Sequence, residues 1–244
     1  MDKIRQPLIS IITIVYNDVQ HIEETILSVI NQTYSNIEYI IIDGKSTDGT
    51  LEVIKRYEHK LNYWISETDN GVFDAMNKGL KHATGDWVNF MNSGDIFENP
   101  NVINNIFNEM NYEGKYAIYG DAVYIRPNRK ELCKAKDINS IRFNMPTTHQ
   151  AFFVRLDIAN EIKFDTKYRY AADYNMIYFI FKKYGVHKFQ HISETVTEYE
   201  ACNGLTMRNQ NKVFREVLNI RQLDIKWLWD YFKYCIKKIL LLKS

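Results

Sequence analysis

Residues 8–17 read LISIITIVYN, a stretch dominated by isoleucine, valine and leucine that ends in Tyr16 and Asn17. A strand with one solvated face alternates apolar and polar residues, whereas a strand buried on both faces is continuously apolar. This stretch therefore predicts a central strand of a parallel sheet. No small-residue cleavage site follows it, so it does not resemble a secretory signal peptide.

Helices and strands alternate beyond this stretch. Apolar residues at helical spacing predict helices within 18–34, within 46–60, where Ser or Thr would cap the helix, and within 69–84, where Gly79 would interrupt it. Short apolar runs predict further strands at 37–43 (IEYIIID), 61–67 (LNYWISE) and 85–95 (GDWVNFMNSGD). Such alternation specifies βαβ units and a parallel sheet, which binds ligands at the carboxyl ends of its strands.

The second half of the chain has a different pattern. Residues 116–136 are rich in Tyr and Val, which predicts strands at the sheet edge or across it. A short apolar strand follows at 145–155, then a helix at 171–185 and a last strand region at 187–200. Residues 203–212 are polar and are expected to be mobile, leading to helical segments through Leu242.

Length and composition favour one large domain. The chain has 244 residues, and its 31 Lys and Arg nearly balance 30 Asp and Glu, so no global basic field favours nucleic acid. Cys133, Cys202 and Cys235 show no spacing typical of disulfides or zinc, which fits a reducing cytosol. No run of 18 apolar residues occurs.

Two carboxylates at the ends of predicted strands are candidate ligand-binding groups. Asp43 could accept a hydrogen bond from a uracil imide or a ribose hydroxyl, or it could be a turn residue that caps the next helix. Asp95 could ligate a divalent cation through one oxygen, with water and a substrate diphosphate completing the shell, or it could form a turn with Ser93 and Gly94.

Other polar residues have both a functional and a structural interpretation. Asp69, Asp74 and Asn77 could hold sugar hydroxyls or a diphosphate, or they could form a solvated helix face. His149 precedes an apolar strand, where a structural role is common. Asp173 could be a general base in a cleft or a helix cap.

Six motifs occur together in one order, and together they resemble the family 2 glycosyltransferases. The motifs are SIITIVYN, IIIDGKSTDGT, SETDNGVFDAMNKG, ATGDWVNFMNSGD, THQAFF and AADYNM. The resemblance runs from about Leu8 to Gly204 and is greatest to bacterial polysaccharide-biosynthesis members. It implies a GT-A fold, with a Rossmann-like, mostly parallel sheet flanked by helices, and an inverting reaction on a sugar nucleotide.

The resemblance also implies roles for single residues. Thr13, Tyr16 and Asn17 would line the nucleotide pocket, and Asp43 would bind the base, usually uracil. Asp69, Asp74 and Asn77 would lie near the ribose, diphosphate or donor sugar. Asp173 matches the catalytic base, and His149 matches the wall between acceptor, metal and donor.

The sequence departs from the family's Asp-x-Asp metal motif. Asn92 takes the place of the first acid, Gly94 that of the third position, and Asp95 is retained. Lys45 stands where the family usually has a small residue. With fewer acids, we expect Mg²⁺ or Mn²⁺ to bind weakly until the nucleotide arrives with it.

These observations predict a GT-A domain over 1–204, with a donor half of about 1–95 and an acceptor half of about 96–204, and a helical extension over 205–244. The expected reaction moves a sugar from a nucleotide diphosphate, commonly UDP, to a glycan or polyprenyl-linked acceptor in cell-surface polysaccharide synthesis. A silent binding scaffold and a nucleotidyltransferase are the alternatives, although YNDVQHIEE lacks the phosphate loop of the latter.

The C-terminal residues 226–243 predict a basic amphipathic helix rich in Trp and Tyr. Such a helix could lie on an anionic membrane surface, which would place the protein in the cytoplasm on the inner face of the plasma membrane. It could equally pack on the catalytic domain or on a second subunit.

Overall fold

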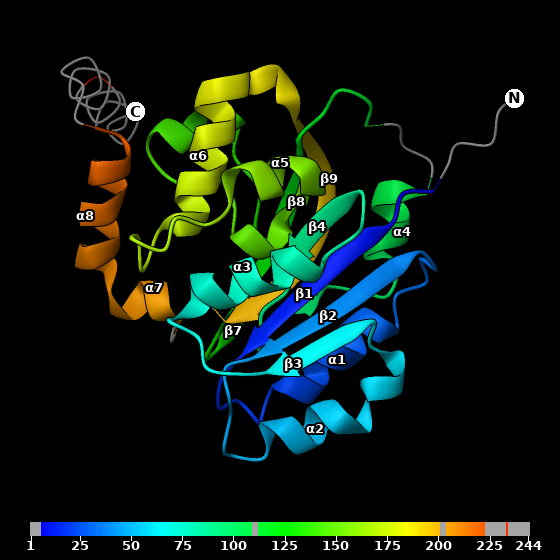
Figure 1. Cartoon of the computed structure of the whole chain (residues 1–244). Coiled ribbons are helices and arrows are strands. Elements are labelled where there is room, and N and C mark those ends of the chain that lie inside the picture. The colour runs from blue at the N-terminus through cyan, green and yellow to red at the C-terminus, as the bar shows by residue number, and fades with distance from the viewer. Residues whose placement is uncertain (1–5, 109–111, 201–203, 223–232, 234–244) are drawn as a thin grey trace, which may run out of the picture.

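The structure is a computed structural model that describes residues 6–108, 112–200, 204–222 and 233, with only the backbone of Leu205 and Thr206. Figure 1 shows a twisted central sheet with helices on both faces. The sheet of this described part has nine strands in the order β3-β2-β1-β4-β8-β6-β9-β5, and β7 pairs with β6 beside that path. The α/β fold with a mostly parallel sheet is as predicted.

The first part of the chain, the predicted donor half, supplies the parallel strands β1 (Ile9–Val15), β2 (Ile37–Asp43), β3 (Tyr63–Ser66) and β4 (Trp87–Phe90). The remaining strands are β5 (Ile96–Phe97), β6 (Ala117–Arg126), β7 (Arg129–Cys133), β8 (Phe152–Arg155) and β9 (Phe189–Glu200). β1 pairs with β2 on one side and β4 on the other. Every residue of β1 is buried, as expected for a strand covered on both faces.

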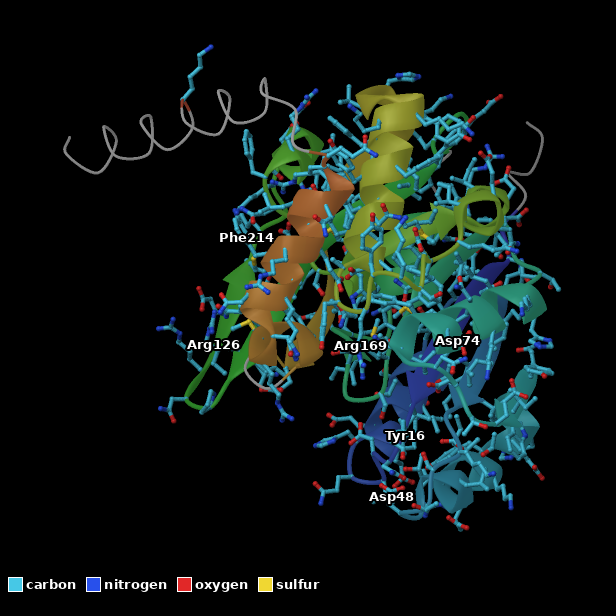
Figure 2. All side chains as sticks on the ribbon, turned by 60° about the vertical axis from the view of Figure 1, so that its left-hand side comes forward. Tyr16, Asp48, Asp74, Arg126, Arg169 and Phe214 are labelled. Carbon is cyan, nitrogen blue, oxygen red and sulfur yellow. The ribbon has the colours of Figure 1, made fainter. Side chains whose placement is uncertain are left out.

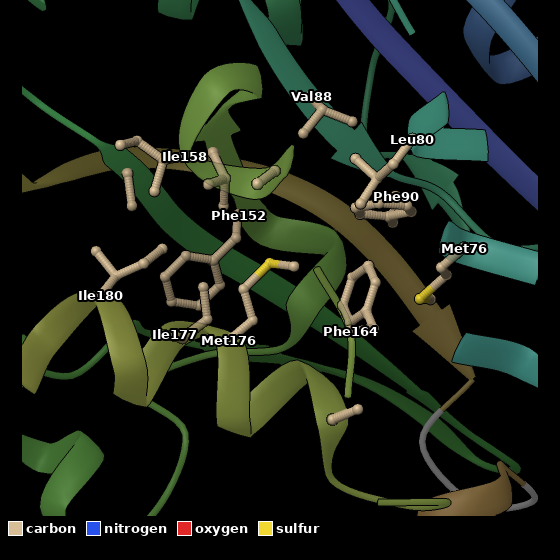
Figure 3. Packing of buried hydrophobic residues seen from close by; sticks show 14 of the residues in the cluster. Met76, Leu80, Val88, Phe90, Phe152, Ile158, Phe164, Met176, Ile177 and Ile180 are labelled. Atoms are coloured by element: carbon tan, nitrogen blue, oxygen red, sulfur yellow. The ribbon is translucent and has the colours of Figure 1, made fainter. Parts of the chain in front are cut away.

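Two hydrophobic cores lie on opposite faces of the sheet. One contains α1 (Ile22–Ile30), α2 (Thr50–Arg56) and α4 (Val102–Phe107). The other contains α3 (Val72–His82), α5 (Leu156–Ile162) and α6 (Ala172–Tyr184). Figure 3 shows part of this second core, in which Met176, Ile177 and Ile180 of α6 pack near Phe152 of β8 and Phe164. The helix predicted at 171–185 is thus present, and these residues form its buried side.

Several local expectations were wrong. Helix α2 begins after Gly49, which has no capping side chain; the Asp48 carboxylate instead accepts the Thr50 N–H. Helix α3 continues through Gly79 because this glycine allows close packing, since a Cβ there would lie 2.4 Å from Ile12 Cγ2. Of the strands expected at the sheet edge, β6 lies between β8 and β9, whereas the pairing described for β7 is with β6 alone, beside the main path of the sheet.

Part of the stretch 203–212, which was expected to be mobile, is helical: it holds α7 (Leu205–Arg208) and the first residues of α8 (Gln210–Ile220). The rest of α8 agrees with the helical segments expected after that stretch. The predicted amphipathic stretch 226–243 lies outside the described residues, apart from Lys233. Among the helices that the structure describes, none has the length and apolar character needed to cross a membrane.

Candidate active site

The polar residues that follow the parallel strands gather at one edge of the sheet. Val15 is paired with Asp43, and Asp43 with Ser66, so the ends of β1, β2 and β3 are level. Tyr16 follows β1 and is 66% exposed. Figure 2 shows Tyr16, Asp48 and Asp74 on one side of the molecule; Tyr16 and Asp48 lie in the connections after β1 and β2, and Asp74 lies in the first turn of α3. This is the edge where open α/β sheets bind ligands.

Asn17 holds the connection after β1 to the connection after β2. Its backbone is left-handed, with φ of 49°, which Asn tolerates better than most residues. Its N–H donates to Ser46 Oγ at 2.8 Å, and its Oδ1 accepts the Thr47 N–H at 2.8 Å. These two hydrogen bonds give the rim of the predicted nucleotide pocket a fixed shape.

Asp43 is fully buried at the end of β2. Its Oδ1 accepts from Ser46 Oγ at 2.5 Å, and its Oδ2 accepts from Ser66 Oγ at 2.5 Å and from the Ser46 N–H at 3.1 Å. Asp43 is therefore a turn residue in this structure, but it does not cap the next helix, whose cap position is Gly49. A nucleobase N–H could reach Asp43 only by replacing one of the serine hydroxyls.

Gly44 lies between two predicted donor-site residues. A Cβ at Gly44 would lie 2.6 Å from Asp69 Oδ2 and 3.2 Å from Tyr16 Cδ2, so only glycine allows Tyr16 and Asp69 to come so near the end of β2. Lys45, which follows, is exposed and has a left-handed φ of 68°. Lys45 thus places an exposed positive charge next to the closely packed Gly44.

The remaining predicted donor residues have structural partners. Asp69 Oδ1 accepts the Gly71 N–H at 2.8 Å, and Asp74 Oδ2 accepts the Asn70 N–H at 2.9 Å, so both hold the start of α3. Asn77 exchanges two hydrogen bonds with the Phe164 backbone, at 2.8 and 2.9 Å. The Asn77 amide is used inside the protein, and its assignment to the donor sugar is not supported by this geometry.

Thr13 is also interior. It is fully buried, its hydroxyl donates to the Met91 carbonyl at 2.8 Å, and it lies 3.0 Å from the Tyr39 hydroxyl. Thr13 therefore joins β1 to its neighbours below the pocket and does not line the surface that a nucleotide would touch.

Asp95 is a nearly buried carboxylate, 9% exposed, just past the end of β4. Its Oδ2 accepts from Gln150 Nε2 at 2.6 Å. Burial raises its pKa from 3.8 to about 6, and the charges of Asp18 and Glu200 act in the same direction, although Gln150 and the charge of His149 oppose the rise. For Asp95, burial thus outweighs the neighbouring groups that stabilise the charged form.

His149 joins the end of β4 to the start of α6. Asn92 Nδ2 lies 3.0 Å from His149 Nε2, and His149 Nδ1 lies 3.4 Å from Asp173 Oδ2. An amide that donates to Nε2 leaves the imidazole proton on Nδ1, the side that faces Asp173. His149 and Asp173 are 24% and 22% exposed, so solvent or a substrate can reach them.

Asp173 is not the cap of α6, because the cap position is Ala171. Its Oδ1 accepts its neighbour's N–H, that of Tyr174, at 2.7 Å, and its Oδ2 faces His149. The structure thus brings Asn92, His149 and Asp173 together from separate segments, as a site shared by the donor and acceptor halves requires.

Sequence reasoning missed several residues of this site. Asp18 Oδ2 accepts from Ser93 Oγ at 2.6 Å, which ties the connection after β1 to the connection after β4. Asp18 directly follows the strand-end residues Tyr16 and Asn17, so its position was a usable signal. Gln150 is next to His149 in sequence, but nothing local indicates that its amide turns toward Asp95.

The oxygen donors near Asp95 fit a divalent cation held mostly by its substrate. Asn92 Oδ1 is buried and accepts no hydrogen bond from the described residues. No group of at least three His, Cys, Asp or Glu side chains arranged for a metal is found in the described part of the chain. An amide oxygen and one carboxylate suit Mg²⁺ or Mn²⁺ that arrives with other oxygen ligands.

Comparison with known proteins identifies relatives across most of the chain. An uncharacterised glycosyltransferase of Mycobacterium tuberculosis is 43% identical over 98 residues, which is 40% of this chain and 37% of that protein. The PGL/p-HBAD biosynthesis glycosyltransferase of Mycobacterium bovis is 28% identical over 214 residues, which is 85% of this chain and 82% of that protein.

Solved structures with the same fold include sugar-nucleotide complexes. Residues 1–349 of S. aureus TarS with UDP-GlcNAc superpose with a TM-score of 0.69 at 19% identity, covering 87% of this chain and 66% of that one. The mannosyltransferase PcManGT of Pyrobaculum calidifontis, with GDP-Man and Mn²⁺, gives a TM-score of 0.66 at 18% identity, covering 89% of this chain and 65% of that one.

At these identities the superpositions show the fold, which is the predicted GT-A arrangement. The family rests on sequence. The model of glycosyl transferase family 2 matches residues 10–177, which include every motif from the first strand to the start of α6. This chain belongs to the family 2 glycosyltransferases.

Proposed function

We propose that the protein is an inverting glycosyltransferase that moves a sugar from a nucleotide diphosphate, UDP in the first instance, to a hydroxyl of a glycan or lipid-linked glycan acceptor. The observation that carries the proposal is the contact series Asn92, His149, Asp173, with distances of 3.0 and 3.4 Å. Through it, the half-buried Asp173 carboxylate of the acceptor half lies near the end of β4, among the polar residues of the donor half.

The donor nucleotide would lie at the ends of β1 and β2. Tyr16 offers an exposed aromatic face, and Asn17 orders the connection beside it. Asp43 would accept the imide N–H of uracil after one serine hydroxyl moves aside, and Asp69 lies next to the same corner. Complexes of TarS with UDP-GlcNAc support UDP as the first nucleotide to test.

Asp95 and Asn92 would hold a divalent cation together with the diphosphate. Gln150 donates a hydrogen bond to Asp95 Oδ2, so Asp95 Oδ1 would be the oxygen that binds the cation. Asn92 Oδ1 accepts no hydrogen bond from the described residues and could be a second ligand. When bound, the cation neutralises charge on the departing nucleoside diphosphate. The Mn²⁺ in the PcManGT complex supports manganese as the metal to test first.

Asp173 would act as the general base. Its carboxylate takes the proton of the acceptor hydroxyl as the hydroxyl oxygen forms a bond to the anomeric carbon. The bond from that carbon to the diphosphate oxygen breaks with its electron pair on the diphosphate. Attack opposite the leaving group inverts the anomeric centre. The His149 Nδ1 proton would orient Asp173 Oδ2 for this role.

The test is release of UDP from a panel of UDP-sugars with Mn²⁺, with and without candidate glycan acceptors. We expect Asp173→Asn and Asp95→Ala to lower the rate at least about a hundredfold, the usual range for losing a general base or a charge-stabilising group. Asp157→Asn is the matched control, because this carboxylate of α5 is 57% exposed and faces Arg155. Equal activity in all variants would contradict the assignment of these residues.

The silent-scaffold alternative is motivated by Asn92, which stands where the family has an acid. Calorimetric titration with UDP separates this alternative from the enzyme. A protein that binds UDP but releases none from any UDP-sugar would be a binding protein. For an active enzyme, proton NMR of the product distinguishes inversion from retention.

A membrane-linked acceptor would suit a role in surface polysaccharide synthesis at the inner face of the membrane. The predicted membrane segment 226–243 can be tested without an acceptor. We expect deletion of the residues after Asp224 to reduce sedimentation with anionic vesicles. Unchanged sedimentation would remove this part of the proposal.

A further inference from the structure

Helix α8 lies beside the start of α6, the helix that carries Asp173. Figure 1 shows the two helices as neighbours, although α8 begins far along the chain from α6. Figure 2 shows Arg169, in the connection that enters α6, next to α8. The contact is polar and centres on Glu216.

The Glu216 carboxylate accepts three backbone N–H groups in succession. Oε1 accepts from Arg169 at 2.9 Å, and Oε2 accepts from Tyr170 at 2.8 Å and from Ala171 at 2.9 Å. Hydrogen bonds from backbone N–H groups to an ionised carboxylate are stronger than those to a neutral acceptor. Glu216 therefore fixes the path of the chain at the entrance to α6.

Helix α6 has no acceptor side chain at its own cap position. Its cap residue is Ala171, which has no polar side chain. The first N–H groups of a helix lack partners within it and favour a negative charge nearby. Glu216 supplies that charge from a different helix.

This arrangement explains how Asp173 can keep one carboxylate oxygen available. An Asp at a helix start commonly uses its side chain to cap the helix. Here only Oδ1 is used in this way, for the Tyr174 N–H, while Oδ2 faces His149 at 3.4 Å. Glu216 thus accepts the N–H of the cap residue Ala171, Asp173 Oδ1 accepts that of Tyr174, and Asp173 Oδ2 is not used to hold the helix start.

A second contact from α8 holds the residue after Asp173. The buried Arg221, just past the end of α8, donates from Nε to the Tyr174 hydroxyl at 2.7 Å. That hydroxyl donates to the Ile141 carbonyl at 2.7 Å. Contacts from α8 therefore lie on both sides of Asp173 in sequence.

We propose that Glu216 is a positioning residue for the reaction: through the 169–171 backbone it holds Asp173 where the acceptor hydroxyl must be deprotonated. The inference rests on the proposed function, in which Asp173 is the base. It assigns to α8, which lies beyond the residues that match the family model, a role in catalysis.

The test compares Glu216→Ala, Glu216→Gln and Arg215→Ala, using the UDP-sugar that gives the fastest UDP release in the panel. Arg215 is the exposed neighbour of Glu216 on α8 and is the matched control. We expect Glu216→Ala to lower kcat about 10- to 100-fold, because small displacements of a catalytic group have effects of this size. The KM for the UDP-sugar should stay within about twofold, because the donor half is untouched.

Glu216→Gln should recover most of the loss. Its amide oxygen can keep the hydrogen bonds to Tyr170 and Ala171, so only the one to Arg169 is lost. Hydrogen exchange gives a readout that needs no activity. In Glu216→Ala the amides of Arg169, Tyr170 and Ala171 should exchange at least about tenfold faster, since local opening controls exchange.

The outcomes separate the two proposals. If Asp173→Asn is inactive but folded Glu216→Ala keeps the wild-type kcat, the positioning role is wrong and the base assignment stands. If Asp173→Asn is as active as the wild type, or the wild type releases no UDP, both are wrong. If Glu216→Ala does not fold, Glu216→Gln provides the test. The inference would be overturned if Glu216→Gln had the wild-type kcat and its backbone amides, that of Arg169 included, exchanged at the wild-type rate.

Discussion

Replacing Asp95 by asparagine should stabilise the empty protein at neutral and alkaline pH, although it removes a residue of the proposed metal site. Asp95 is 9% exposed and its charged form is poorly solvated. Asparagine has the same shape and can present its carbonyl oxygen to Gln150 Nε2, which now donates to Asp95 Oδ2. The substitution removes the buried charge and keeps the hydrogen bond.

The magnitude follows from the pKa of Asp95, which burial raises from 3.8 to about 6. Because the folded-state pKa exceeds the unfolded one, the fold binds the proton more tightly. The resulting stabilisation is complete below about pH 3.8 and is lost as the pH rises through about 6. Above that pH the charged carboxylate costs about 3 kcal/mol, since each pKa unit corresponds to about 1.4 kcal/mol.

The assay is urea unfolding of both proteins in chelator-containing buffer at about pH 4 and about pH 8. The difference in free energy of unfolding, variant minus wild type, should rise by up to about 3 kcal/mol between these values. With the exposed Asp157→Asn the same difference should change by less than about 1 kcal/mol. An Asp95→Asn difference that does not rise with pH would show that Asp95 is not a buried carboxylate with a raised pKa.

Other predictions concern the metal, the nucleotide and the packing of α3. Calorimetry should show Mn²⁺ binding at least about tenfold tighter with UDP than without it, and Asn92→Asp should strengthen binding to the empty protein, because each added acid raises cation affinity. Tyr16→Ala should weaken UDP binding by about 1–3 kcal/mol in the same assay, the value of one aromatic stacking contact, while unfolding stability stays unchanged. Gly79→Ala should destabilise the protein by about 1–3 kcal/mol in urea unfolding, because its Cβ would lie 2.4 Å from Ile12 Cγ2.

The donor half could be predicted from sequence because its strands are buried on both faces. β1 and β2 have continuous apolar runs, and the helices between strands carry apolar residues at helical spacing. Topology then places the residues after each strand at one edge. This is why Asp43 and Asp95, which follow different strands, could both be proposed as ligand-binding groups before their contacts were known.

The second half could not be ordered in the same way, because strand pairing depends on distant partners. β6 pairs with β8 and β9, which begin at Phe152 and Phe189, and no local feature of Ala117–Arg126 indicates either partner. Gly79 shows the same limit within a helix. In the sequence, Gly79 suggests an interruption of the helix. In the structure, a glycine is needed at this position because Ile12 of β1 packs against it.

The site was predicted in its residue types but not in its hydrogen bonds. Its position at a strand end indicated Asp43, and the family resemblance indicated Asp173. Ser66, which donates to Asp43, and Glu216, which accepts from the backbone at the start of the helix of Asp173, come from other segments. Long-range hydrogen bonds decide which carboxylate oxygens remain available. Thr13 and Asn77 likewise use their side chains in hydrogen bonds to distant parts of the backbone.

The replacement of an acid by Asn92 and the raised pKa of Asp95 have one physical consequence. A site with two adjacent acids would attract a cation in the empty protein, whereas here one acid is retained and burial raises its pKa from 3.8 to about 6. In the proposed site the cation would stabilise the ionised form of Asp95, and a diphosphate would supply the cation's remaining oxygen ligands. The donor would thus complete the site that binds it, and metal affinity measured without the nucleotide would underestimate how strongly the metal is held during the proposed reaction.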